Sequence, residues 1–289
     1  MSSATHHASG SEPCGGQTIG ARPFLLLSHH RSGSNFTTDL IQHHPDVDII
    51  DEPLSMHTAL FPEQDLVRWP ASGEGDDTDS GGAVEFLDEL IEHMRRSPRP
   101  RGFKETLLFE KLDWLHARCP ELVVVHLMRD PRAIAHSVLR HPMRKQWRYR
   151  TAVPRYLADS PARGIRSDLL DLASEVDLVV ASWLIRRAEA ERHLPLFTST
   201  IEVQLESLVL TPTQALRRMM GALGLTPAPA QLQFLKDSQR ESRGGPYSTF
   251  RTRRDILESW REGLSHSAIT RIEYLVDAHG VDLQEHRSA

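Results

Sequence analysis

The sequence predicts an α/β fold of three layers, in which a mostly parallel sheet is flanked by helices. Short apolar runs alternate along the chain with longer segments whose apolar residues recur at helical spacing. Two of the runs, residues 24–27 and 122–128, are almost continuously apolar, which is typical of parallel strands covered on both faces. Polar residues follow both runs directly, and open α/β sheets bind their ligands beyond the carboxyl ends of the strands.

Length and composition fit a single domain of this kind. The chain has 289 residues, of which 39% are hydrophobic and 25% charged, so one domain over residues 22–289 can bury a large core. The polar and Gly-rich residues 1–21 are expected to form a disordered leader. The formal charge of −5 gives no reason to expect a nucleic-acid partner.

Cysteine content and hydropathy bear on the compartment. Cys14 and Cys119 are the only cysteines, and their spacing fits neither a disulfide framework nor a metal site. No apolar run approaches the roughly 20 residues that a membrane span needs. The first residues also lack the apolar centre of a signal peptide. We therefore predict a cytoplasmic protein without a transmembrane segment.

The first half of the chain predicts four strands separated by helices. Three of the strands are short, mostly apolar runs, the strand at 101–104 is brief and carries Lys104 at its end, and the helices have apolar residues on one side. The strands are expected at residues 24–27, 47–50, 101–104 and 122–128. The helices are expected at residues 33–43, from Val84 to Met94, and through Leu112 and Leu115. Residues 70–82 are rich in Gly, Ser and Asp and predict a mobile surface loop.

The second half of the chain predicts one further strand and several helices. The strand is expected at residues 201–205. Thr211 and Pro212 form a good helix start, and Gly280 a good helix end. The helices are expected around residues 136–139, at 168–192, from Thr211 to near Gly224, around Trp260, and at 265–278. A polar loop is expected at residues 238–254. The Arg-rich residues 141–166 predict an excursion from the sheet, either a lid over an acceptor or a solvated loop.

The loop after the first strand reads Arg31-Ser-Gly-Ser-Asn-Phe36. A loop of small residues at a helix N-terminus offers free backbone N–H groups and the positive end of the helix dipole, so it can bind an anion. The nucleotide-triphosphate pattern G-x-x-x-x-G-K-[ST] and the dinucleotide pattern G-x-G-x-x-G are both absent. By itself the loop could equally be an ordinary strand-to-helix turn.

A second polar segment follows the strongest strand. Arg129 stands at its end, and Ser137 comes eight residues later in the next helix. An arginine in this position can bind a phosphate through two hydrogen bonds, and Ser137 can face the same ligand. Taken alone, Arg129 could instead pair with a carboxylate of the fold. Together with the first loop, the pair of segments is specific.

Over residues 22–280 these segments resemble the sulfotransferases that use 3′-phosphoadenosine-5′-phosphosulfate (PAPS). The loop at 31–36 resembles the 5′-phosphosulfate loop of that family, and Arg129 with Ser137 resembles its 3′-phosphate motif. The segment from Glu202 to Leu225 resembles a later strand–Glu–helix segment, and residues 251–264 resemble a C-terminal nucleotide loop. The resemblance implies a P-loop-like sulfotransferase fold and PAPS as the co-substrate, with no metal.

The resemblance also implies roles for individual residues. Donor-binding residues would be Arg31, Ser32, Gly33, Ser34, Asn35, Phe36, Arg129, Ser137, Arg253 and Arg254. Arg31 and Lys104 would stabilise the transferring group, although Lys104 could also be a surface cation, and Arg253 and Arg254 part of a solvated face. Glu52, at the end of the strand after the first helix, would be the catalytic base, as in the carbohydrate and tyrosyl-protein branches. It could instead be a loop carboxylate paired with an arginine.

Two departures from the family patterns qualify these roles. Leu205-Glu206-Ser207 stands where the family usually has Tyr-Glu-Asp, so one nucleotide contact is missing or supplied elsewhere. Members that act on hydroxyls and phenols with a histidine base have that His just beyond Lys-Thr, whereas this chain has Lys104-Glu105-Thr106. That departure favours the branch with a glutamate base and leaves Glu105 as a competitor to Glu52.

The predicted reaction is transfer of the sulfuryl group from PAPS to a hydroxyl of a small molecule, carbohydrate or lipid. Two other functions stay open: an ATP-dependent small-molecule kinase, for which the loop lacks the lysine, and a non-catalytic nucleotide-binding protein. A metal site at the adjacent histidines 29–30 and 43–44 is not favoured, because neighbouring side chains on a strand or helix point in different directions.

Overall fold

The computed structural model describes residues 22–56, 81–106, 108–140, 146–159, 164–245 and 247–283. The predicted leader at residues 1–21 lies outside the described residues. So does the predicted loop at 70–82, except for its last two residues, which begin helix α3 (Gly81–Arg95).

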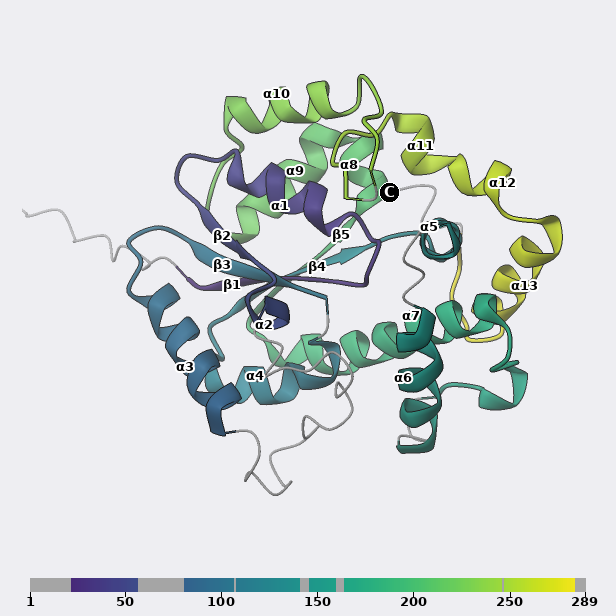
Figure 1. Ribbon diagram of the computed structural model, residues 1–289. Coiled ribbons are helices and arrows are strands. Elements are labelled where there is room, and N and C mark those ends of the chain that lie inside the picture. The colour runs from purple at the N-terminus through teal and green to yellow at the C-terminus, as the bar shows by residue number, and fades with distance from the viewer. Residues whose placement is uncertain are drawn as a thin grey trace, which may run out of the picture.

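Five parallel strands form one sheet in the order β2-β3-β1-β4-β5 (Figure 1). The strands are β1 (Phe24–Ser28), β2 (Asp48–Asp51), β3 (Arg101–Glu105), β4 (Val123–Met128) and β5 (Ser199–Gln204). Each lies within two residues of its predicted position. Because all five run in one direction, their carboxyl ends meet at a single edge of the sheet. The predicted α/β class with a mostly parallel sheet is confirmed.

Alternate residues of β1 point into different layers, which explains its continuous apolar sequence. Phe24 and Leu26 pack with α1 (Ser34–Gln42), α9 (Pro212–Ala222) and α10 (Pro229–Ser238) on one face. Leu25 and Leu27 pack with α3 and α4 (Leu112–Arg118) on the other. Figure 1 shows these two groups of helices on opposite sides of the sheet. Residues of β1 are therefore buried whichever way they point.

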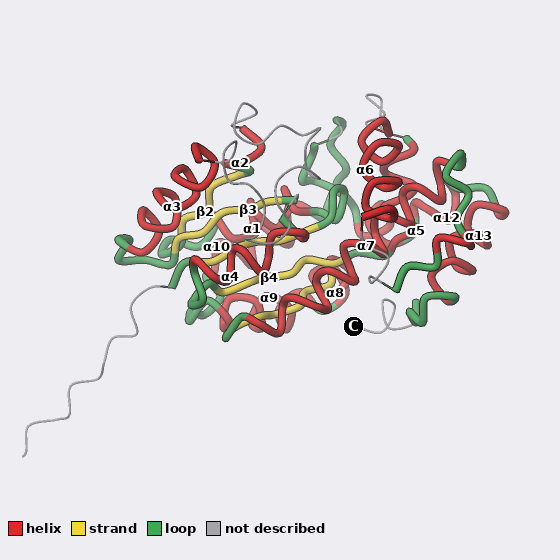
Figure 2. The backbone as a smooth tube through the Cα atoms, turned by 90° about the horizontal axis from the view of Figure 1, so that it is seen from below, coloured by secondary structure: helices red, strands yellow, loops and turns green. Residues whose placement is uncertain are grey.

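A third apolar cluster lies beyond the edge of the sheet, among helices. It joins α5 (Pro131–Leu139), α6 (Gln146–Asp159), α7 (Glu175–His193) and α13 (His266–Asp277), which Figure 2 shows gathered at one end of the molecule. The predicted excursion at residues 141–166, expected to be a lid or a solvated loop, contains a helix. Its helix α6 buries Tyr149, Val153 and Tyr156 in this cluster, and residues 141–145 and 160–163 lie outside the described residues.

Several boundaries differ from the predictions for local reasons. The helix predicted at 168–192 begins only at Glu175, because Ser174 caps its first turn by accepting the Asp177 N–H; residues 167–169 form a 3-10 turn instead. The strand predicted at 201–205 ends at Gln204, where α8 (Leu205–Leu210) begins and buries Leu205 and Leu208.

Five of the described helices had no counterpart in the prediction: α2 (Pro53–Met56), α6, α8, α10 and α11 (Arg253–Leu257). The last begins within the predicted polar loop at 238–254, where Thr252 and Asp255 cap each other's backbone N–H groups. The short helix predicted around Trp260 is α12 (Ser259–Gly263).

Candidate active site

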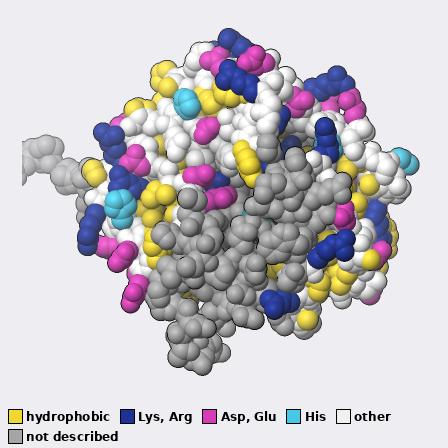
Figure 3. All heavy atoms as spheres, viewed as in Figure 1, with side chains coloured by type: hydrophobic (Ala, Val, Ile, Leu, Met, Phe, Trp, Pro, Cys, Tyr) yellow, Lys and Arg dark blue, Asp and Glu magenta, His cyan; other side chains and the backbone are white. Residues whose placement is uncertain are grey.

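A cavity of about 630 Å³ opens at the carboxyl ends of the strands. Its walls include the loop between β1 and α1, the residue that follows β2, and parts of α5, α6, α7 and the segment before α11. The size is ordinary for a ligand site. On the face seen in Figure 3, basic and acidic side chains of the described residues lie beside one another. The concentration of arginines inside the cavity is therefore a local feature.

The loop between β1 and α1 has the backbone of an anion cradle. Arg31 and Gly33 both have positive φ, 68° and 89°. No side chain caps the N-terminus of α1, so the N–H groups of its first turn are left for a ligand. A Cβ at position 33 would lie 2.8 Å from the Leu205 side chain. Glycine is thus required at this position by its backbone angle and by the lack of space.

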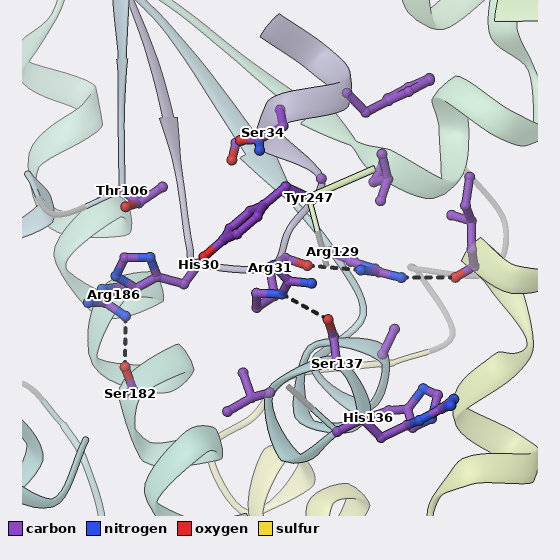
Figure 4. A pocket seen from close by; sticks show the side chains of 18 of the residues that line it. His30, Arg31, Ser34, Thr106, Arg129, His136, Ser137, Ser182, Arg186 and Tyr247 are labelled. Carbon is purple, nitrogen blue, oxygen red and sulfur yellow. Dashed lines mark hydrogen bonds between the residues drawn. The ribbon is translucent and has the colours of Figure 1, made fainter. Parts of the chain in front are cut away.

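Two of the predicted ligand arginines are held against this loop (Figure 4). Arg31 Nε donates to Ser137 Oγ over 2.9 Å. Arg129, which follows β4, donates from Nη1 to the Arg31 carbonyl over 2.8 Å and from Nη2 to the Ile256 carbonyl over 3.3 Å. Arg129 Nε is buried and has no hydrogen-bond partner among the described residues.

Electrostatics favour an anion among these groups. Burial lowers the pKa of Arg129, which Arg31 and Arg251 lower further by repulsion while Glu206 and Asp130 oppose the shift. Burial also lowers the pKa of Arg31, and Arg251 contributes to that shift. Arg31, Arg129 and Arg251 all line the cavity. Three guanidinium groups that destabilise one another's charge favour an anionic ligand between them.

The structure does not bring Arg253 and Arg254 into the cavity. Both are exposed at the start of α11, and Arg254 pairs there with Glu262. Arg251 lines the cavity instead, together with Tyr247, whose ring centroid lies 5.9 Å from the Arg31 guanidinium carbon. The capping interaction of Thr252 turns the chain between the two groups of arginines, and no sequence pattern marked that turn in advance.

Lys104 is not a surface cation. Its side chain is 1% exposed, and its Nζ lies 2.9 Å from Asn35 Oδ1, 2.6 Å from Asp51 Oδ1 and 3.1 Å from Glu52 Oε1. Lys104 therefore sits directly behind Asn35 and Glu52, which both line the cavity. Sequence reasoning missed Asp51, the second carboxylate on this lysine.

The two candidate carboxylates have different surroundings. Glu52 lines the cavity, has a positive φ of 43° and a half-buried side chain, and donates its backbone N–H to the Lys104 carbonyl over 3.0 Å. Glu105 is buried and accepts the Leu54 N–H over 2.7 Å. Its carboxylate therefore lies against the start of α2, and it does not line the cavity.

The remaining loop residues divide between the cavity and the core. Gly33, Ser34, Asn35 and Phe36 line the cavity. Ser32 is buried behind it, and its Oγ has no hydrogen-bond partner among the described residues. Phe36 also packs on Phe234, with ring centroids 5.7 Å apart. Ser32 is thus the one predicted loop residue whose side chain lies away from the cavity.

Glu206, part of the segment that departs from the family pattern, lies beneath Arg129. Its Oε1 accepts the Asp130 N–H over 3.1 Å, and burial raises its pKa to about 7 against the opposing effect of Arg129. Asp130 in turn caps α5 and pairs with Arg132, Nη2 to Oδ2, over 2.6 Å. This buried network fixes the end of β4 and therefore the position of Arg129.

Neither a metal-binding cluster nor a membrane-spanning helix occurs among the described residues. No group of three or more His, Cys, Asp or Glu side chains is arranged there to hold a metal ion. None of the described helices combines the length and the apolar character that crossing a membrane would require.

The fold and the cavity define an α/β protein with a candidate anion site at a glycine-containing strand-to-helix loop. A model of the sulfotransferase family matches residues 23–229, well over half of the chain, and the chain belongs to that family. No curated protein sequence was found that matches it significantly.

Two solved structures share the fold. The sulfotransferase domain from the curacin biosynthetic pathway has a TM-score of 0.54 at 14% identity, over 92% of this chain and 99% of that one. Mouse sulfotransferase SULT7A1, complexed with PAP, also has a TM-score of 0.54, at 13% identity over 92% of this chain and 87% of that one. The predicted sulfotransferase fold is confirmed.

Proposed function

We propose that the protein transfers the sulfuryl group of PAPS to a hydroxyl of a small-molecule, carbohydrate or lipid acceptor. The observation that carries this proposal is the convergence of Arg31, Arg129 and Arg251 on one glycine loop. A nucleotide with phosphates at both its 3′ and 5′ positions needs two anion sites close together. Membership of the sulfotransferase family supports the same donor.

The donor would lie across the loop with its two charged ends apart. The N–H groups at the start of α1, with Arg31, would hold the 5′-phosphosulfate. Arg129, Ser137 and Arg251 would hold the 3′-phosphate, and the buried, unpartnered Nε of Arg129 supports that role. The complex of mouse SULT7A1 with PAP supports a 3′,5′-bisphosphate as the product of the donor.

In the transfer step the acceptor oxygen would attack sulfur as the bond between sulfur and the 5′-phosphate oxygen breaks. Glu52 would take the acceptor's proton, and the bisphosphate would leave with the bonding electron pair. General-base catalysis typically contributes about 10²–10⁴ in rate. Lys104, 3.1 Å from Glu52 Oε1, would neutralise charge on the transferring group, as preorganised donors do for about 3–4 kcal/mol.

Before the donor arrives, the ammonium group of Lys104 pairs with the carboxylate of Glu52. Asp51 adds a second carboxylate to the same Nζ. Bound phosphosulfate would compete for the ammonium group and free Glu52 to accept a proton. This arrangement supports the Glu-base branch over one in which histidine acts, because Thr106 stands where a His would be needed.

Transfer of labelled sulfate from PAPS to a panel of hydroxylated acceptors tests the proposal. We expect labelled product with at least one acceptor class and without added metal. A protein that binds the bisphosphate but transfers sulfate to nothing, water included, would be a nucleotide-binding protein without this activity. Phosphate transfer from ATP with magnesium would identify the kinase alternative. A cytoplasmic location stays a prediction.

A further inference from the structure

The cavity extends past the donor loop to a second polar end. In Figure 4, His30, Thr106, Ser182 and Arg186 lie on one side of Arg31, and Arg129 and His136 on the other. The donor groups described above occupy the second side. The first side contains charged groups that none of the proposed steps uses.

Arg186, on α7, is the main group at this end. Its side chain is buried, yet it lines the cavity. Nη1 donates to Ser182 Oγ over 2.8 Å, while Nε is buried and has no hydrogen-bond partner among the described residues. Within the same residues, no carboxylate forms an ion pair with Arg186. A buried guanidinium is costly unless an anion meets it.

Two neighbours of Arg186, His29 and Phe109, do not supply that anion. His29 lies 3.4 Å from Ser182 Oγ through Nε2, and burial together with the Arg186 charge holds its pKa well below the ordinary value. Phe109 faces Arg186 with its ring centroid 6.0 Å from the guanidinium carbon. A neutral imidazole and a ring face carry no negative charge, so neither forms an ion pair with Arg186.

Glu110, on the 3-10 helix η3 (Phe109–Lys111), brings a carboxylate to the same cavity. It is buried, and its Oε1 has no hydrogen-bond partner among the described residues. Thr106 Oγ1 is likewise buried and has no hydrogen-bond partner among the described residues. This end of the cavity therefore offers an unmet cation and, separately, an unmet hydrogen-bond acceptor.

We propose that Arg186 binds a carboxylate on the sulfate acceptor, and that Glu110 receives an N–H or O–H group of the same molecule. A guanidinium edge matches a carboxylate with two parallel hydrogen bonds. The acceptor would then be a hydroxylated carboxylic acid with a further hydrogen-bond donor. This inference rests on the proposed function, because it assigns the space next to the bound donor to the acceptor.

A different role for Arg186 would be to hold the sulfuryl group during transfer. In that case its removal would lower turnover for charged and neutral acceptors alike. As an acceptor-binding residue, it should instead change the KM and affinity of acids and leave those of neutral analogues nearly unchanged.

Calorimetry of three phenolic probes tests the inference. Each probe is titrated into the protein loaded with 3′,5′-adenosine bisphosphate (PAP). The probes are 3-(4-hydroxyphenyl)propionate, its amide, and tyrosine. We expect the acid to bind at least tenfold more tightly than the amide, and Arg186→Gln to abolish that preference. Arg187→Gln is the matched control, since the neighbouring Arg187 pairs with Glu191 over 2.7 Å and does not line the cavity.

Glu110 is tested by the added ammonium group of tyrosine. We expect tyrosine to bind more tightly than the propionate, and Glu110→Gln to remove that gain while Asp113→Asn keeps it. Equal binding of acid and amide, or a preference that survives in Arg186→Gln, would overturn the inference. PAP binding is measured first in every variant. If the wild type does not bind PAP, the proposed function itself is wrong. If it binds PAP but does not prefer the acid to the amide, only the acceptor assignment is wrong.

Discussion

Arg251 and Arg254 stand three residues apart yet face different surroundings. Arg251 lines the cavity and adds by repulsion to the lowering of the Arg129 pKa that burial causes. Arg254 is exposed and pairs with Glu262. The position of each guanidinium, not its presence in an Arg-rich segment, decides which can meet a phosphate.

We predict that Arg251→Gln weakens binding of 3′,5′-adenosine bisphosphate by about tenfold or more, since a charged hydrogen bond typically contributes about 1.5–3 kcal/mol. Arg254→Gln should leave that affinity within about twofold, because an exposed ion pair contributes little. Calorimetric titration of both variants measures the difference. Equal losses of bisphosphate affinity in the two variants would mean that the solvent-facing arginines also bind the 3′-phosphate.

Glu52 is the residue for which the chemistry makes the sharpest demand. Glu52→Gln should lower turnover by about 10²–10⁴ and leave bisphosphate affinity nearly unchanged, because the amide keeps the size of the side chain and cannot take the proton. Glu105→Gln is the matched comparison. If Glu105→Gln removes turnover with folding intact and Glu52→Gln does not, the base is Glu105.

Sequence motifs located much of the site at the residue scale. The structure gathers Arg31, Gly33, Glu52, Arg129 and Ser137 around one cavity. The first four follow a parallel strand or begin the next helix, and Ser137 lies on α5, the helix that follows Arg129. Arg186 and Glu110 could not be found in this way, and Asp51, although it ends β2, was not recognised as a partner of Lys104. Each matters through a partner distant in sequence or through the lack of one, and such relations leave no local pattern.

At the scale of elements, the site depends on how closely α8 approaches the start of α1. Leu205 opens α8 and fills the space beside Gly33. The sequence predicted the strand and helix on either side of Gly33, but it did not predict α8. A short strand that runs directly into a helix has an apolar pattern too brief to separate the two.

Gly33→Ala should therefore be more harmful than alanine at a glycine with a similar backbone angle. Gly164 has φ of 69°, and nothing lies within 4 Å of a Cβ built there. We expect Gly33→Ala to lower the free energy of unfolding by about 1–3 kcal/mol more than Gly164→Ala does, from overpacking, and to weaken bisphosphate binding. Denaturant titrations of both variants, with and without the bisphosphate, measure this. Equal destabilisation and unchanged binding would mean that the loop tolerates the displacement.

At the scale of the whole molecule, two buried groups give stability opposite dependences on pH. Burial raises the pKa of Glu206 from 4.5 to about 7, so its contribution is present below pH 4.5 and is lost as pH rises through 7. Burial lowers the pKa of His126 from 6.5 to about 4, so its contribution is present above pH 6.5 and is lost as pH falls through 4. Between pH 4.5 and 6.5 the two trends offset each other.

Glu206→Gln should remove the pH dependence of stability that Glu206 causes and leave that of His126. Relative to the wild type, its free energy of unfolding should rise by up to about 3 kcal/mol between pH 4.5 and 7, because glutamine has no proton to lose. His126→Gln should show the opposite slope. Denaturant midpoints at several pH values measure both differences. A Glu206→Gln difference that is flat over this window would mean that the carboxyl group titrates normally in the folded protein.

The fold as a whole was more predictable than its peripheral part. Continuous apolar strands and polar strand ends require a covered parallel sheet with a site at one edge, and both are present. The helical cluster around α6 and α7 was not foreseen, because α6 mixes buried tyrosines with many arginines. Its apolar face becomes apparent only when α7 lies against it.

The central claim is that the cavity is built for a nucleotide with phosphates at both the 3′ and 5′ positions. Calorimetric titration with 3′,5′-adenosine bisphosphate, adenosine 5′-phosphate, and ATP with magnesium tests it most directly. We predict that the bisphosphate binds at least tenfold more tightly than either of the others, and that Arg129→Gln abolishes this preference. Equal affinity for the bisphosphate and adenosine 5′-phosphate, or tighter binding of ATP with magnesium, would contradict the claim.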